Sequence, residues 1–172
     1  MAISVADYLI DQRGIEWSKV LASWSWLLPP KFTLRLVNRF ADLFLVLPDG
    51  TVHMLDVGAG TLTKLADSRD DFGAKIDEDD NANQWLMIPL VDKMVAAGAV
   101  LQPGQCYGFK TPPVLGGDYT VENAGPQPVW DYLGAYGSIH EQLQDVPDGS
   151  QVVLKVVNKP AEPSAPADSW GM

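Results

Sequence analysis

The stretch from Phe32 to Leu65 constrains the fold more than any other part of the sequence. Phe32, Leu34 and Leu36 alternate with polar residues, which is the period of a half-buried strand. Four strand-like runs, separated by turn residues, follow one another here: 32–36, 43–47, 51–55 and 61–65, with Pro48-Asp49-Gly50 and Gly58-Ala59-Gly60 between the last three. Short strand patterns joined by such turns indicate hairpins, so the last three runs predict three antiparallel strands that form a meander, and the run from Phe32 begins the sheet.

Helical patterns lie on both sides of this meander. They cover Ser4 to Gly14, Trp17 to Leu28, Ser68 to Ile76, Asn81 to Gly98, and Val129 to Val146. The second has Trp17, Leu21, Trp24 and Leu28 on one helical face, which predicts that these tryptophans belong to the core. Ser68 with Asp71 forms a capping box. Pro89 must either kink the Asn81 helix or split it in two, and the sequence leaves both options open.

Further strand patterns complete the fold prediction. They occur at 105–110, 119–123 and 152–156, and a tail without periodicity follows Lys159. Strands grouped before the central helices predict an α+β fold, with a mainly antiparallel sheet packed against helices in a single domain. We divide the chain into a helical segment at 1–31, the main domain at 32–157 and a disordered tail at 158–172.

The charge of the chain restricts its partners. Asp and Glu number 22 against 12 Lys and Arg, which gives a net charge of -10. Such a field repels phosphate and anionic lipid and speeds encounter with a basic protein, so we expect no nucleic acid and no membrane as partner. The first residues lack the features of a secretory signal and no run is long enough to span a membrane, which predicts a cytoplasmic protein.

Half of this charge is concentrated between Asp67 and Asp80. Acids in the first turn of the Ser68 helix are explained by the helix dipole. Four acids follow at the end of that helix, where negative charge has no local benefit: Asp77, Glu78, Asp79 and Asp80. These four are candidate contacts for a basic partner, and the alternative is that they only solvate the surface.

Motifs for catalysis and metal binding are incomplete in this sequence. His140-Glu141 begins like the H-E-x-x-H zinc motif, but Gln144 stands where the second histidine must be. The run 77–83 imitates the start of a calcium loop, yet Ala82 replaces the turn glycine and Ile88 the bidentate glutamate. We therefore expect no metal, no cofactor and no catalysis. The rival interpretation is a hydrolase that uses His140, Glu141 and Asp145, although His140 lies on an apolar helical face typical of a structural histidine.

Two strings in the second half are the most specific in the chain: GQCYGFKTPPVLGG and SIHEQLQDVPDG. With FADLFLVLPDGTVHMLDVGAGTLTKLA before them, residues of about 32–157 resemble the C-terminal domain of bacterial immunity proteins that neutralise type VI secretion DNase effectors, the Tdi type. A more distant likeness to the SUKH immunity superfamily rests on the order of helices and strands.

The resemblance implies a binding function without catalysis. An immunity protein binds its cognate toxin in the cytoplasm of the producing cell and blocks it, and an acidic inhibitor suits the basic surface of a nuclease. Gly116 and Gly117, in a loop within the first string, are further candidate partner contacts. A housekeeping interaction module with no toxin partner is the second alternative to this function.

Overall fold

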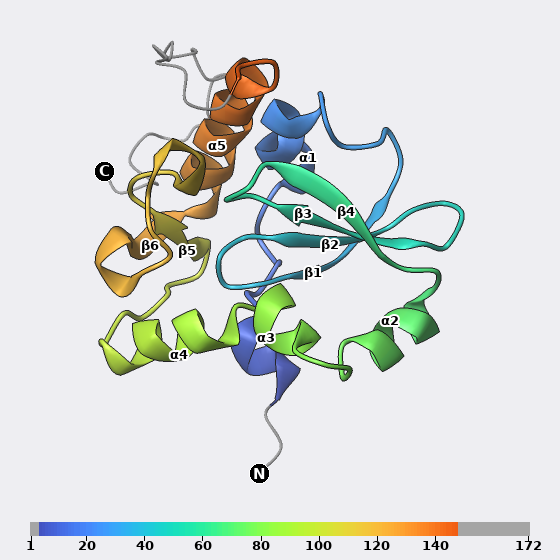
Figure 1. The fold of residues 1–172 in the computed structure, drawn as a ribbon, viewed down its shortest axis with the longest axis horizontal. Helices are drawn as coiled ribbons and strands as arrows, with labels where there is room; N and C mark the ends of the chain where they lie inside the picture. Colours follow the sequence, from blue (N-terminus) through green and yellow to red (C-terminus); the bar gives the residue numbers. More distant parts are fainter. Residues whose placement is uncertain (1–3, 148–172) are drawn as a thin grey trace.

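The computed structural model describes residues 4–147, and its centre is a four-stranded antiparallel sheet (Figure 1). The strands are β1 (Thr33–Val37), β2 (Leu43–Val46), β3 (Val52–Asp56) and β4 (Thr61–Ala66), in the order β1-β2-β3-β4. Each pairs with its neighbour in sequence, so the predicted meander is confirmed. With the helices around it, the fold is α+β in one compact domain, as expected.

The apolar character of β2 matches its position in the interior. Leu43, Phe44 and Leu45 are all fully buried, so both faces of this strand are covered. On one face Phe44 packs against Phe72, with ring centroids 5.9 Å apart, and Phe72 stacks on Trp85 at 5.5 Å. A continuous apolar run is typical of a strand covered on both faces.

The N-terminal segment is less helical than its pattern predicts. It forms the 3-10 turn η1 (Val5–Tyr8), one turn of α-helix, α1 (Trp17–Val20), and a second 3-10 turn, η2 (Leu21–Trp24). The expected first helix stops at Tyr8 because Leu9 instead bridges Asn38 at the end of β1. Trp24 is fully buried, as predicted, and its indole N–H donates to the carbonyl of Leu133 at 2.9 Å.

Three short helices follow the sheet: α2 (Arg69–Lys75), α3 (Asn81–Trp85) and α4 (Ile88–Ala96). The Ser68 cap is confirmed, since its hydroxyl accepts from Asp71 N at 3.0 Å. The choice left open at Pro89 is settled: Met87 adopts the left-handed conformation (φ 52°), which splits the helix, and Pro89 lies in the first turn of α4. Val95 in α4 is 56% exposed, whereas the apolar pattern of this helix favours a buried position for it.

A second, two-stranded sheet pairs β5 (Gln105–Phe109) with β6 (Ala124–Pro128). The strand expected at 119–123 is wrong: this segment holds the 3-10 turn η4 (Val121–Asn123), after a similar turn η3 (Pro113–Leu115). The strand that does pair comes directly after it. Helix α5 (Val129–Leu143) then buries four members of its apolar stripe, Val129, Leu133, Tyr136 and His140, and leaves the fifth, Leu143, half-buried.

Figure 1 shows how these parts surround the sheet. Helices α3 and α4 follow one another along the lower side of the view, whereas α5 and the β5–β6 pair lie on the left. None of the helices within 4–147 has the length and hydropathy needed to cross a membrane. The strand expected at 152–156 and the tail at 158–172 lie outside the described residues, and the division at 31/32 stays a prediction.

Candidate partner-binding site

The predicted acidic residues form the link between α2 and α3, here called the acidic link (Asp77, Glu78, Asp79 and Asp80). All four are exposed, and no ion pair joins any of them to a Lys or Arg within residues 4–147. The link is held at both ends, because Asn81 Nδ2 donates to the carbonyl of Lys75 at 2.7 Å and Asn83 Nδ2 donates to Asp80 Oδ1 at 2.7 Å. It therefore presents negative charge on a fixed backbone.

The second predicted segment, Gly116-Gly117, lies in a loop closed by one side chain. Asn123 accepts from Thr111 N at 2.9 Å and donates to the carbonyls of Thr111 and Asp118, both at 2.9 Å. A Cβ at Gly117 would collide with the Thr111 carbonyl, so this position requires glycine for close packing of the loop. Gly116 is exposed, and Gly117 has a structural role whether or not it touches a partner.

A cavity of about 360 Å³ has in its lining Asn83 and Tyr119, which are close in sequence to the acidic link and to the Gly116-Gly117 loop. Its walls come from the segment before β2, from β3 and the turn after it, from the α3–α4 region, from the end of β5 and from the loop between η3 and η4: Phe40, Asp42, Met54, Asp56, Gly58, Asn83, Gln84, Met87, Pro89, Leu90, Phe109 and Tyr119. Asn83 is the residue that bonds Asp80, and Tyr119 follows Gly117 by two positions. The acidic link and the glycine loop are thus each connected to a residue of the lining, although neither lines the cavity itself.

The buried wall of this cavity contains Asp42, which is 3% exposed. Its Oδ1 accepts from Val57 N at 2.8 Å and its Oδ2 accepts from Asn38 Nδ2 at 2.9 Å. Burial raises the pKa of this carboxyl well above its usual range, and the charge of nearby Asp56 raises it further. Ionising a carboxyl group in this position costs free energy, because the charge is removed from water, and a nearby cation offsets that cost.

The buried Asn38 fixes the Asp42 backbone as well as its side chain. Asn38 Oδ1 accepts from Phe40 N and Asp42 N, both at 2.9 Å. Its Nδ2 also donates to the carbonyl of Trp85 at 2.9 Å, which ties the end of α3 to the sheet. The cavity is therefore built on a hydrogen-bonded frame that connects β1, β2 and α3.

Asp42 and Asp56 are not among the site residues predicted from the sequence, although the sequence contains a signal for them. Asp42 precedes the first strand of the β2–β3 hairpin and Asp56 ends the second strand. Leu43 pairs with Leu55, so the register places the two carboxylates side by side at the open end of the hairpin. Two acids in such flanking positions predict a site of concentrated negative charge. Tyr119 is more than 60 residues away in sequence, and no local pattern connects it to them.

Comparison with known families bears on the same part of the chain. Residues 66–140 match the family T6SS immunity protein Tdi1, C-terminal. The resemblance found in the sequence is confirmed over this stretch, which is shorter than the 32–157 expected. The Tdi1 match includes the acidic link, the glycine loop and most of α5, whereas Asp42 and Asp56 precede it. No match was found among curated proteins.

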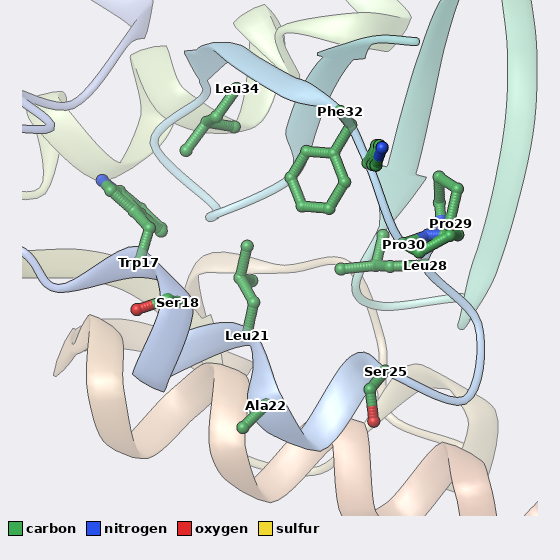
Figure 2. A pocket seen from close by; sticks show the side chains of 11 residues that line it. Trp17, Ser18, Leu21, Ala22, Ser25, Leu28, Pro29, Pro30, Phe32 and Leu34 are labelled. Carbon is green, nitrogen blue, oxygen red and sulfur yellow. The ribbon is translucent and has the colours of Figure 1, made fainter. Parts of the chain in front are cut away.

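A larger hollow lies outside the Tdi1-matched stretch, between the N-terminal turns and the edge strand β1 (Figure 2). It measures about 840 Å³ and is lined by Trp17, Ser18, Leu21, Ala22, Ser25, Leu28, Pro29, Pro30, Lys31, Phe32 and Leu34. Figure 2 shows Leu21 of η2 and Phe32 pointing toward each other across it. Lys31 is the one ionisable side chain in this lining, so among the described residues the groove offers apolar contact and no acid–base pair.

The residues of the rival hydrolase interpretation do not share a site. His140, the last residue of the Tdi1 match, is 5% exposed and faces the core. Glu141 and Asp145 are exposed. Within residues 4–147 no group of three or more His, Cys, Asp or Glu could hold a metal ion.

Proposed function

We propose that this protein is an immunity protein that binds and neutralises a cognate secreted toxin, a type VI effector, in the cytoplasm. The observation that carries the proposal is the match of residues 66–140 to the Tdi1 C-terminal family. The protein acts by occupying a surface of the toxin and performs no chemistry of its own.

The acidic link gives this binding a physical basis. Asp77, Glu78, Asp79 and Asp80 are exposed and carry no ion pair to a described Lys or Arg. A toxin that acts on nucleic acid needs a basic surface for the phosphate backbone, and unpaired carboxylates on a fixed link complement such a surface. The Gly116-Gly117 loop, which precedes Tyr119 in the lining of the cavity, provides a second contact in this proposal.

Co-purification and a viability assay test the proposal together. The full chain is co-expressed with the product of the adjacent gene, and complex formation is measured by affinity capture. We expect capture, and survival of cells that express the toxin. Absence of both capture and protection contradicts the proposal and favours a housekeeping interaction module.

The stoichiometry of protection separates binding from catalysis. A binding inhibitor protects only when its amount reaches that of the toxin, so toxin activity should fall linearly and reach zero near a 1:1 ratio when binding is tight. Complete protection at a small fraction of that ratio is the result expected of a hydrolase, and it would contradict a non-catalytic function.

A further inference from the structure

We propose that the cavity between Asp42, Asp56 and Tyr119 binds the guanidinium group of an arginine side chain inserted by the toxin. The identity of the partner rests on the proposed function. The chemistry of the ligand rests on the cavity itself, and the experiments below keep the two apart.

The charge of the cavity is the first support. Two carboxylates line it, and the described residues add no Lys, Arg or His to its wall. Asp42 uses one hydrogen bond on each oxygen, from Val57 N and Asn38 Nδ2, and each carboxylate oxygen can accept a second. A 97% buried carboxylate that borders an open hollow and faces a second acid is stabilised by a cation entering from outside.

The aromatic wall is the second, independent support, because it selects the kind of cation. Phe40 and Phe109 are stacked with centroids 5.2 Å apart, and Tyr119 meets Phe109 edge-on at 4.9 Å. All three residues line the hollow, Phe40 and Phe109 as buried side chains and Tyr119 as a half-exposed one. A planar guanidinium stacks on an aromatic ring while its N–H groups donate to carboxylates, whereas an ammonium ion lacks the flat shape and the fork of donors.

The entrance fits a side chain that comes from a protein surface. Tyr119, 51% exposed, stands at the mouth with Asn83, Gln84 and Pro89, which are also exposed. The volume of about 360 Å³ is large enough to admit one long side chain. Asn83 also bonds Asp80, so the acidic link lies beside the entrance and attracts the same cation at longer range.

The cavity can be tested without the toxin. We would titrate the full chain with N-acetyl-arginine amide and follow backbone amide shifts by NMR, with the N-acetyl amides of citrulline and lysine as neutral and ammonium controls. We expect saturable shifts around Gly58, Asn83 and Tyr119 with the arginine probe only. Equal shifts from the citrulline probe, equal binding of the lysine probe, or no shifts at all would overturn the proposal.

A matched pair of variants tests the inserted arginine. Asp56→Asn keeps an oxygen for the Ala59 N–H, which Asp56 Oδ1 accepts at 3.0 Å. Asp49→Asn makes the same change at the other end of the hairpin, where Asp49 Oδ1 accepts from Thr51 N at 3.0 Å. We expect Asp56→Asn to weaken toxin binding about ten-fold or more, and Asp49→Asn to have little effect.

The outcomes separate the two proposals. Tight toxin binding that is equal in Asp56→Asn and Asp49→Asn overturns the arginine site and leaves the immunity function intact. Absence of toxin binding by the unaltered chain overturns the immunity function, and the arginine probe then still decides the chemistry of the cavity. Tyr119→Leu is the second variant, because it removes the ring without changing charge, and it must also weaken binding of the arginine probe.

Discussion

The Nε2 atom of His140 lies 2.9 Å from the carbonyl oxygen of Val57. A carbonyl can only accept a hydrogen bond, so this nitrogen carries the proton of the neutral ring. The contact joins α5 to the turn between β3 and β4, and the ring also lies 5.7 Å from Trp24. His140 is thus part of the packing between three separate segments, as its position on an apolar helical stripe predicts.

Replacement of His140 by Ala should lower the free energy of unfolding by roughly 1–3 kcal/mol, because it leaves the Val57 carbonyl unpaired and creates a small cavity. Urea unfolding followed by tryptophan fluorescence measures the change. Toxin binding by the folded variant should be unaltered. A folded His140→Ala protein that has lost a measurable catalytic activity would show that the residue is more than structural.

The stability of the protein should depend on pH through the same residue. Burial lowers the pKa of His140 below its usual 6.5, and the hydrogen bond with the Val57 carbonyl and the charge of Asp56 only partly oppose this. The unfolded ring therefore takes up a proton at a pH where the folded ring does not, and the free energy of unfolding falls as pH decreases below 6.5.

The comparison that isolates this effect is with His140→Gln, which can still donate to Val57. Asp42 titrates in both proteins, so its contribution cancels from the difference. Urea unfolding at pH 7.5 and 5.5 should show a larger loss of stability for the unaltered protein than for the variant. The same loss in both would assign the pH dependence to other groups.

Gly60 should tolerate alanine much less well than Gly50. Both have positive φ, 71° and 89°, but a Cβ at Gly60 would overlap the His140 imidazole whereas a Cβ at Gly50 meets nothing within 4 Å. We expect urea unfolding to show a loss in the free energy of unfolding of about 1 kcal/mol for Gly50→Ala and of roughly 2–4 kcal/mol for Gly60→Ala. The double variant Gly60→Ala/His140→Ala should be more stable than the sum of the single effects predicts. Strict additivity would mean that the overlap is relieved elsewhere.

Neutralising the acidic link should slow association with the toxin. Changing Asp77, Glu78, Asp79 and Asp80 to Asn or Gln leaves the fold intact, because all four are exposed. Surface charges act mainly on the on-rate, so stopped-flow mixing at low salt should show a decrease of about ten-fold, with a smaller change in dissociation.

The control for this variant changes the same net charge at scattered exposed positions: Asp7, Asp49, Glu141 and Asp145. If the link acts locally, the scattered variant associates faster than the link variant. Equal rates for the two would mean that only the overall charge matters, and an unchanged rate for the link variant would assign the link to solubility.

The meander could be predicted because its turns and its alternation agree. Pro48-Asp49-Gly50 separates two runs whose apolar residues then pair in the register Leu43–Leu55. The strand Ala124–Pro128 was missed for the opposite reason: its sequence, AGPQP, has none of the residues that favour strands, and it is held by pairing with β5. Pairing with β5 therefore determines the conformation of Ala124–Pro128, although its residues have a low preference for strands.

The junction between α3 and α4 shows another limit. Pro89 indicates a break, but the left-handed residue is Met87, a conformation for which the sequence offers no glycine or asparagine. Its neighbours Leu86 and Ile88 are buried, so burial on both sides fixes the turn. The acidic cavity escaped prediction in the same way, because its residues meet only through hairpin register and a distant loop.

Cys106 makes the rate of global opening directly measurable. It is the single thiol of the chain, it is fully buried in β5, and burial raises its pKa so that the reactive thiolate is scarce in the folded state. An alkylating reagent can therefore modify the protein only when β5 is exposed. At high reagent concentration the labelling rate equals the opening rate. A bound toxin should lower this labelling rate, and the size of the decrease measures how much the complex stabilises the folded state.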